Sequence, residues 1–273
     1  RKSGNHLTSK RRTMSVSVAG TTGPAPSETL ALFVSDLHLS SELPKTTERF
    51  FGFLRNHALK TKALYLLGDI FEYWAGDDDL EDPFHRVVIQ SLRNVSDHGV
   101  PVYWIAGNRD FLVGDSFASA CGMQLLSEPH IAEIAGKRIL LLHGDAQCTD
   151  DTAYMAFRLQ VRDLQWQSAF LARPLAERKA IISGMREGSR EAQREKPMAI
   201  MDVNAREVER LFDAYGVTLM IHGHTHRPQV HEHEGRIRYV LPDWDCDADV
   251  VRGGWIAMGA GGEILRVNMT ESN

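Results

Sequence analysis

The chain has 273 residues, 43% of them hydrophobic and 25% charged, which is ordinary for a globular protein and sufficient for a sizeable core. Its formal net charge of −5 argues against a nucleic-acid-binding surface, which is normally basic, so we expect no nucleic-acid partner. Three cysteines without a CxxC pair indicate a reducing compartment rather than a disulfide framework. No apolar run approaches the roughly 20 residues that span a bilayer, so we expect a soluble chain.

The first residues differ in composition from the rest. Residues 1–29 are rich in Ser, Thr, Gly and Pro, and no apolar h-region follows the basic Lys10-Arg11-Arg12, so this is not a typical signal peptide. We interpret the segment as a disordered or expression-derived tail, with Met14 as a candidate native start.

From Leu30 onward, short apolar runs alternate with segments of helical periodicity. Each run is about five residues long and ends in Gly or polar residues, as buried strands do. The runs are 30–34, 63–67, 102–106, 138–142 and 217–221. Apolar residues at helical spacing predict helices over 84–95 and 208–215. This alternation predicts an α/β layered fold with its sites at the carboxyl ends of the strands.

Two further segments complete the chain. After His226 the pattern predicts hairpins, with 229–233 paired to 236–241 and 254–258 paired to 263–267. Residues 150–199 contain no strand-like run and have a helix-forming composition rich in Arg and Lys. We interpret them as a helical insertion, or cap, in a core made of 30–149 and 200–268.

Polar residues follow each of the five apolar runs. Asp36 and His38 are two residues apart, which allows both to point to one side of a strand exit. Oxygen and nitrogen donors also follow the other runs: Asp69, Asn108, His143, His224 and His226. Such donors without thiolate favour Mn²⁺, Fe²⁺ or Zn²⁺ over Ca²⁺. Asp69, alone on its loop, is the natural bridge between two cations, which can generate a hydroxide nucleophile and neutralise a phosphoryl oxygen.

Each cluster taken alone has a simpler explanation. An Asp-x-His pair is common by chance, and a Gly-Asp or Gly-Asn pair usually marks only a turn. His231 and His233 repeat the spacing of the preceding histidine pair, and we interpret them as solvated hairpin residues. Five clusters in one order, each at a strand exit, favour a metal site over these explanations.

The five motifs together resemble the calcineurin-like metallophosphoesterase superfamily: Asp36-x-His38, Gly68-Asp69, Gly107-Asn108, His143 and Gly223-His224-x-His226. The resemblance implies a four-layer α/β/β/α metallophosphoesterase sandwich, here with a helical cap. It also implies two metal sites that share one carboxylate. One site takes Asp36, His38, Asp69 and His226, and the other takes Asp69, Asn108, His143 and His224.

The third motif indicates which kind of phosphate bond is cleaved. It reads Gly107-Asn108-Arg109-Asp110, where many members of the superfamily have Gly-Asn-His-Glu with a His that assists the leaving group. Arginine cannot act as a general acid at neutral pH, but it holds phosphate oxygens bidentately. Arg109 therefore favours a leaving group that needs little protonation, such as a phosphate ester within a pyrophosphate, and argues against a protein phosphatase.

The sequence around the motifs, from about Leu30 to Trp244, resembles the branch of this superfamily that hydrolyses UDP-2,3-diacylglucosamine in lipid A synthesis. The resemblance implies release of UMP and 2,3-diacylglucosamine 1-phosphate with two Mn²⁺ ions per chain, other divalent ions being alternatives. It places the enzyme on the cytoplasmic face of the inner membrane of a Gram-negative bacterium. Implied catalytic residues are Asn108, Arg109 and His224, and implied substrate contacts are these three with Asp151, Ser189, Gln193 and Lys196.

The cap has two interpretations. Its apolar residues fit a groove for two acyl chains, or they only pack the cap onto the core: Tyr154, Phe157, Trp166, Phe170, Leu171 and Ile181. Its Arg and Lys residues fit reversible contact with anionic lipid head groups, or an ordinary solvated face.

Two rival functions remain at this point. A nucleotide or cyclic-nucleotide phosphodiesterase of the same superfamily would need a smaller, more polar pocket without an apolar cap. A non-catalytic scaffold would have lost metal ligands, and none is lost here. Nothing in the sequence indicates the oligomeric state.

Overall fold

The structure is a computed structural model that describes residues 28–195 and 202–269, with side chains up to Arg186 in the last helix before the gap. The predicted tail, residues 1–29, lies outside this part except for its last two residues. There the prediction is wrong, because Thr29 begins the first strand.

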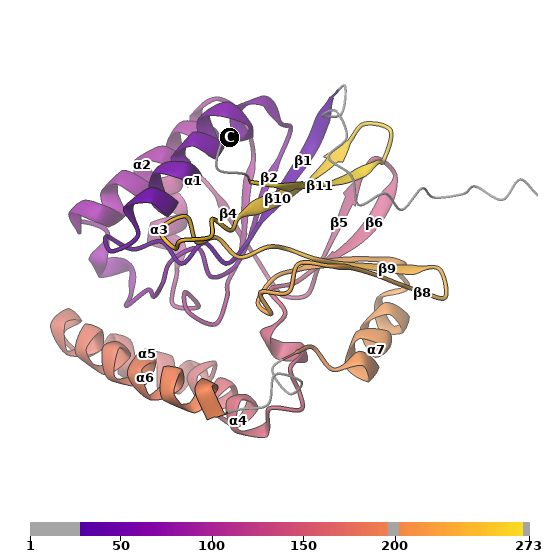
Figure 1. Cartoon of the computed structure of the whole chain (residues 1–273). Coiled ribbons are helices and arrows are strands. Elements are labelled where there is room, and N and C mark those ends of the chain that lie inside the picture. Colours follow the sequence, from indigo (N-terminus) through magenta and orange to yellow (C-terminus); the bar gives the residue numbers. More distant parts are fainter. Residues whose placement is uncertain (1–27, 196–201, 270–273) are drawn as a thin grey trace, which may run out of the picture.

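Two mixed sheets occupy the middle of the molecule (Figure 1). The first runs in the order β11-β10-β1-β2-β3-β4: β1 (Thr29–Val34), β2 (Leu64–Leu67), β3 (Val102–Ile105), β4 (Gln124–Leu126), β10 (Gly254–Gly259) and β11 (Ile264–Asn268). The second runs in the order β5-β6-β7-β9-β8: β5 (His130–Ile134), β6 (Lys137–Leu141), β7 (Leu219–His222), β8 (Val230–His233) and β9 (Arg236–Val240). The five predicted apolar runs form β1, β2, β3, β6 and β7, and both predicted hairpins are present.

Alternating side chains on the strands create the layers. In β1, Phe33 belongs to the core between the two sheets, whereas Leu32 and Val34 pack with the helices on the outer face, as the two-residue period of a strand requires. Three helices cover that face: α1 (Pro44–Asn56), α2 (Pro83–Asp97) and α3 (Asp115–Cys121). On the other side, α7 (Ala205–Tyr215) packs against the outer residues of β6 and β7. The predicted four-layer sandwich is confirmed.

The ends of the helices follow from local sequence. Asp82 caps α2 by accepting the N–H of Phe84, and Pro83 occupies the first helical position, where its missing N–H costs nothing. Asn204 caps α7, and Gly216 ends it at φ 58° in the left-handed region. Short 3₁₀ turns lie elsewhere: η1 (Ala58–Lys60), η2 (Asp77–Asp79) and η3 (Asp145–Gln147).

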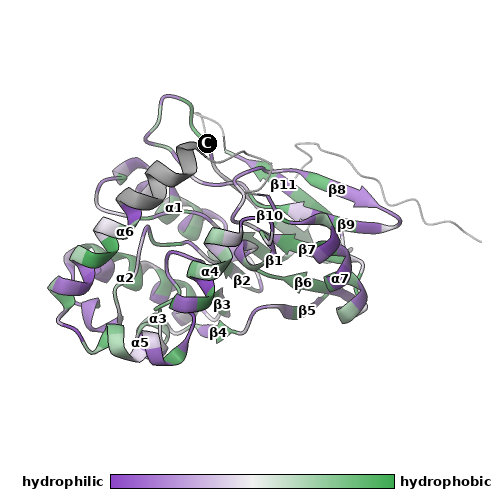
Figure 2. Ribbon diagram, turned by 90° about the horizontal axis from the view of Figure 1, so that it is seen from below, coloured by the Kyte–Doolittle hydropathy of each residue, from purple (hydrophilic) through white to green (hydrophobic). Residues whose placement is uncertain are grey.

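The predicted insertion is helical. It consists of α4 (Thr152–Val161), α5 (Leu164–Leu171) and α6 (Leu175–Glu195), and residues 196–199 lie outside the described part. These helices lie along one side of the sandwich, and a view from below places them in front of the sheets, each mixing hydrophobic and hydrophilic residues (Figure 2). Among the described residues, no helix is both long and apolar enough to cross a bilayer.

Candidate active site

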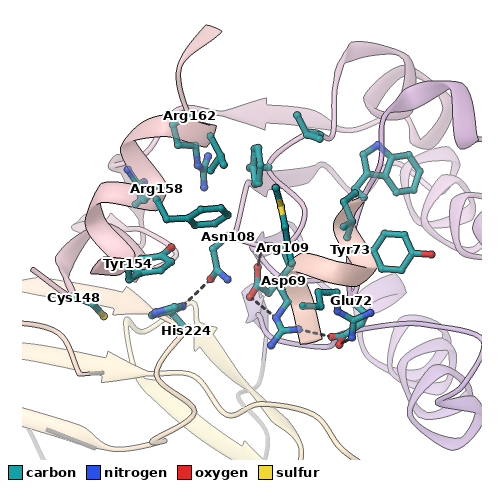
Figure 3. Close-up of a pocket in the computed structure, with 18 of the residues that line it drawn as sticks. Asp69, Glu72, Tyr73, Asn108, Arg109, Cys148, Tyr154, Arg158, Arg162 and His224 are labelled. Atoms are coloured by element: carbon teal, nitrogen blue, oxygen red, sulfur yellow. Dashed lines mark hydrogen bonds and ion pairs between the residues drawn. The ribbon is translucent and has the colours of Figure 1, made fainter. Parts of the chain in front are cut away.

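Loops at the carboxyl ends of five strands bring the predicted donors together. Their ligand atoms form two groups, each with all atoms within 4.8 Å of one another. The first group is Asp36, His38 and His226, and the second is Asp69, His143 and His224. Asn108 joins the second group, with its Oδ1 3.0 Å from His143 Nε2 and 2.9 Å from His224 Nδ1 (Figure 3).

The backbone at these donors is unusual. Five non-glycine donors have positive φ: Asp36 (54°), His38 (49°), Asp69 (53°), His224 (68°) and His226 (53°). A side chain in this region costs of order 1–3 kcal/mol, and such residues cluster at functional sites. The surrounding fold therefore holds a strained backbone that aims the five side chains at one another.

The first group fits a cation. Asp36 Oδ1 is buried and has no hydrogen-bond partner among the described residues. His38 Nε2 and His226 Nε2 face each other at 3.2 Å, and His226 Nε2 lies 3.5 Å from Asp36 Oδ1. A buried carboxylate oxygen without a hydrogen bond is costly, and a divalent cation accepts an oxygen and two imidazole nitrogens together.

The second group fits a cation for a different reason. His143 Nδ1–H donates to the carbonyl of Leu67 at 2.8 Å, which leaves Nε2 to face Asp69 Oδ2 at 3.6 Å. Burial raises the pKa of Asp69 to about 7. Burial lowers the pKa of His143, but the charges of Asp69 and Asp36 outweigh it and raise this pKa to about 9. The pair thus retains a proton that a divalent cation would replace.

Two carboxylates to which the sequence analysis gave no role support the donors. Asp110 is fully buried and accepts the N–H groups of Asp69, Ile70 and Gly107 at 3.2, 2.7 and 2.8 Å, so it ties the loop after β2 to the loop after β3. Its place in the Gly-Asn-Arg-Asp motif was a sequence signal that could have identified it.

Glu128 accepts the N–H of His143 at 2.7 Å, and no sequence signal marked it.

A cavity of about 610 Å³ opens beside the two groups, and Arg109 and Asn108 point into it (Figure 3). Apolar residues of core and cap also line it: Trp74, Phe111, Leu112, Phe157, Val161, Trp166, Phe170, Ile182 and Met185. Of the six predicted groove residues, Leu171 and Ile181 do not line it. Ile181 packs against the core of the first sheet, and its neighbour Ile182 lines the cavity instead, because successive helical residues point about 100° apart.

Four basic residues of the cap contact the core, whereas Arg173 is half exposed and pairs with Glu177. The side chains of Arg190, Arg194 and Lys196 lie outside the described part, so a solvated or lipid-facing basic surface on the cap stays a prediction. Arg178 is only 1% exposed and donates to the Ala75 carbonyl and the Asp78 carboxylate. Lys179 Nζ lies 2.7 Å from Asp79 Oδ1. In α4, Arg158 donates to Asp145 at 2.7 Å and Arg162 donates to the Gly107 carbonyl at 2.9 Å. These side chains hold the cap onto the core.

The remaining predicted residues divide into described and undescribed ones. Asp151 is buried, lines the cavity and caps α4. Ser189 and Gln193 lie on α6 beyond its described side chains, and Lys196 lies outside the described residues. On β8, His231 is half-buried and His233 is exposed, and neither joins a candidate metal group in the described part of the chain.

Comparisons with known proteins give one family model and several relatives. The family model described as Calcineurin-like phosphoesterase matches residues 30–228. A UDP-2,3-diacylglucosamine hydrolase from Aromatoleum aromaticum is 48% identical over 226 residues, which cover 81% of this chain and 92% of that protein. Its counterpart from Escherichia coli O81 is 48% identical over 225 residues, covering 81% and 93%. A solved archaeal phosphodiesterase is 11% identical with a TM-score of 0.46 and covers 88% of this chain and 99% of its own.

Proposed function

The chain belongs to the calcineurin-like phosphoesterase family and is a hydrolase, and from this premise we propose that it cleaves the pyrophosphate bond of UDP-2,3-diacylglucosamine. The products are UMP and 2,3-diacylglucosamine 1-phosphate. One observation carries the proposal: a single cavity is lined both by predicted donors, among them Asp69, Asn108 and His224, and by apolar residues of the cap. A substrate that joins a pyrophosphate to acyl chains matches both kinds of lining.

We infer that these donors would hold two divalent cations. Mixed oxygen and nitrogen donors without thiolate favour Mn²⁺, Fe²⁺ or Zn²⁺ over Ca²⁺, and Mn²⁺ is the ion that the family resemblance implies. Asp36, His38, Asp69 and His226 hold one ion, and Asp69, Asn108, His143 and His224 hold the other. When bound, such ions supply an activated water and neutralise charge on phosphoryl oxygens.

Side chains beside the donors bind and orient the substrate. Arg109 projects into the cavity with its side chain 29% exposed, so its guanidinium is able to bind phosphate oxygens bidentately. Burial and the charge of His143 lower the pKa of His224 to about 4. His224 is therefore neutral at pH 7 and orients the substrate rather than donating a proton to it. No general acid is needed, because a departing phosphate ester has a second pKa of about 6.

The apolar cap residues that line the cavity provide a surface for binding acyl chains. Burying acyl chains against aromatic and aliphatic side chains contributes roughly 0.8 kcal/mol per methylene, so acylated substrates gain binding energy that deacylated ones lack. The similarity to UDP-2,3-diacylglucosamine hydrolases of Gram-negative bacteria supports a site of action at the cytoplasmic face of the inner membrane. A lipid-bearing substrate there requires reversible contact with the membrane surface.

The direct test is Mn²⁺-dependent release of UMP from UDP-2,3-diacylglucosamine, with UDP-N-acetylglucosamine as the control substrate. We expect a strong preference for the diacyl substrate and loss of turnover after chelation. Equal turnover of both would refute the acyl groove and favour a general nucleotide phosphodiesterase. No UMP from either substrate in metal-loaded protein would refute the proposed reaction.

Replacing Phe157 with Ala should reduce kcat/KM for the diacyl substrate by about 3–10-fold. Phe157 lines the cavity and is 41% exposed, and covering that exposed part contributes a corresponding share of the roughly 1.5–3 kcal/mol for a fully buried aromatic side chain. Leu159→Ala is the matched control: Leu159 lies on the same helix, is 77% exposed and does not line the cavity. Steady-state kinetics of both variants decide the question. Equal effects of the two substitutions would contradict this placement of the acyl chains.

A further inference from the structure

The Glu72 side chain lies where the metal cluster meets the cap. Its Oε2 is 3.0 Å from Arg109 Nη1 and 3.4 Å from His38 Nδ1, and its Oε1 forms an ion pair with Arg186 of α6. The Glu72 side chain is only 15% exposed. One carboxylate therefore contacts the loop after β1, the loop after β3 and the cap; Figure 3 shows its ion pair with Arg109.

We propose that Glu72 is a positioning residue that holds Arg109 and Arg186 as a pair facing the cavity and links the cap to His38. The identity of the anion that this pair receives rests on the proposed function. The link to His38 rests only on the metal site.

The charges explain why a carboxylate is needed here. Arg109 and Arg186 both line the cavity, and two guanidinium groups near one another repel. Each arginine also loses rotamer entropy when it is fixed. Glu72 offsets the repulsion and fixes both side chains before substrate arrives, which is preorganisation. Both guanidinium groups line the cavity, where they are able to bind phosphate oxygens.

The contact with His38 adds a second effect. His38 presents Nε2 towards His226 and Nδ1 towards Glu72. This contact is an ion-pair distance without a hydrogen bond, because His38 Nδ1 has no hydrogen-bond partner among the described residues. A carboxylate this close to the outer nitrogen favours the tautomer with its proton on Nδ1, and loss of a carboxylate that orients a metal-binding histidine typically costs 10–100-fold in metal affinity or activity. Glu72 thus connects the position of the cap to the affinity of the metal cluster.

A neighbouring ion pair separates this role from simple tethering. Lys179, also on α6, pairs with Asp79 at 2.7 Å, and the Asp79 side chain is 5% exposed. Asp79 does not line the cavity. Asp79→Asn therefore weakens a cap–core ion pair without altering the arginine pair, and it is the matched control for Glu72→Gln.

The experiment compares Glu72→Gln and Asp79→Asn in the full-length chain. Calorimetric titration with Mn²⁺ alone should show one of two sites weakened by about 10–100-fold in Glu72→Gln and both sites within about threefold of wild type in Asp79→Asn. KM for the diacyl substrate should rise at least about tenfold in Glu72→Gln, with a smaller change in kcat. Equal effects of the two variants on KM and on Mn²⁺ affinity would overturn the proposal.

Two further measurements distinguish a failure of the Glu72 proposal from a failure of the proposed function. If Glu72 acts on KM through Arg186, adding Glu72→Gln to Arg186→Gln should cost much less than adding it to wild type; full additivity would overturn the pairing. The Mn²⁺ titration needs no substrate. Weakened Mn²⁺ binding in Glu72→Gln, in a chain that releases no UMP, would refute the proposed function and support the link to His38.

Discussion

Asp69→Ala is expected to abolish turnover and to prevent loading of both metal sites. Asp69 is 2% exposed and is the one residue that we assign to both cations. Losing metal-based stabilisation of several kcal/mol corresponds to a fall in kcat/KM of roughly 10³-fold or more. Kinetics in excess Mn²⁺, together with metal content by elemental analysis, measure the effect.

The Asp69→Asn variant tests the effect of the Asp69 charge on metal binding while it keeps the shape of the side chain. Asp69 Oδ1 accepts the backbone N–H of Arg109 at 2.8 Å, and an asparagine carbonyl preserves that bond while it removes the bridging charge. We expect this variant to fold like wild type by circular dichroism and still to bind metal poorly. Full activity in either variant, with two metals bound, would refute the role of Asp69 as the bridge between the two ions.

Arg109→Ala should lower kcat/KM by roughly 10²–10³-fold without loss of metal. The loss is that of a charge-assisted donor to the reacting phosphate, which is typical of removing one such group from an active site. The substitution removes the contact of Arg109 Nε with Asp69 Oδ2 at 3.7 Å, but the backbone N–H of residue 109 still donates to Asp69 Oδ1, so the metal site should persist. Kinetics and metal content of the same preparation provide the measurement.

Arg109→Lys is the informative companion variant. Lysine keeps the positive charge but lacks the planar fork that binds two oxygens, so we expect at most partial recovery of kcat/KM. Recovery to the wild-type value would show that charge alone is sufficient. Loss of metal in Arg109→Ala would contradict the role in substrate binding and indicate a structural part of the metal site.

Local sequence signals predicted much of the fold. The apolar runs that became β1, β2, β3, β6 and β7, and the cap of α7 at Asn204, depend on residues within a few positions of one another. Less regular elements were not predicted, including α1, α3, β4 and β5. β4 is only three residues long, and a run that short carries no periodicity to detect.

By itself, the sequence determined which donors exist, in what order, and that each follows a strand, because those features are local and the carboxyl ends of parallel strands meet at one edge. Only the tertiary structure showed how these donors are held. Asp36 and Asp69 have positive φ, Asp110 accepts an N–H group from the loop after β2, and Glu72 pairs with Arg186. These features depend on segments distant in the chain. Such contacts are set by burial and charge in the folded molecule, for which neighbouring letters in the sequence carry no signal.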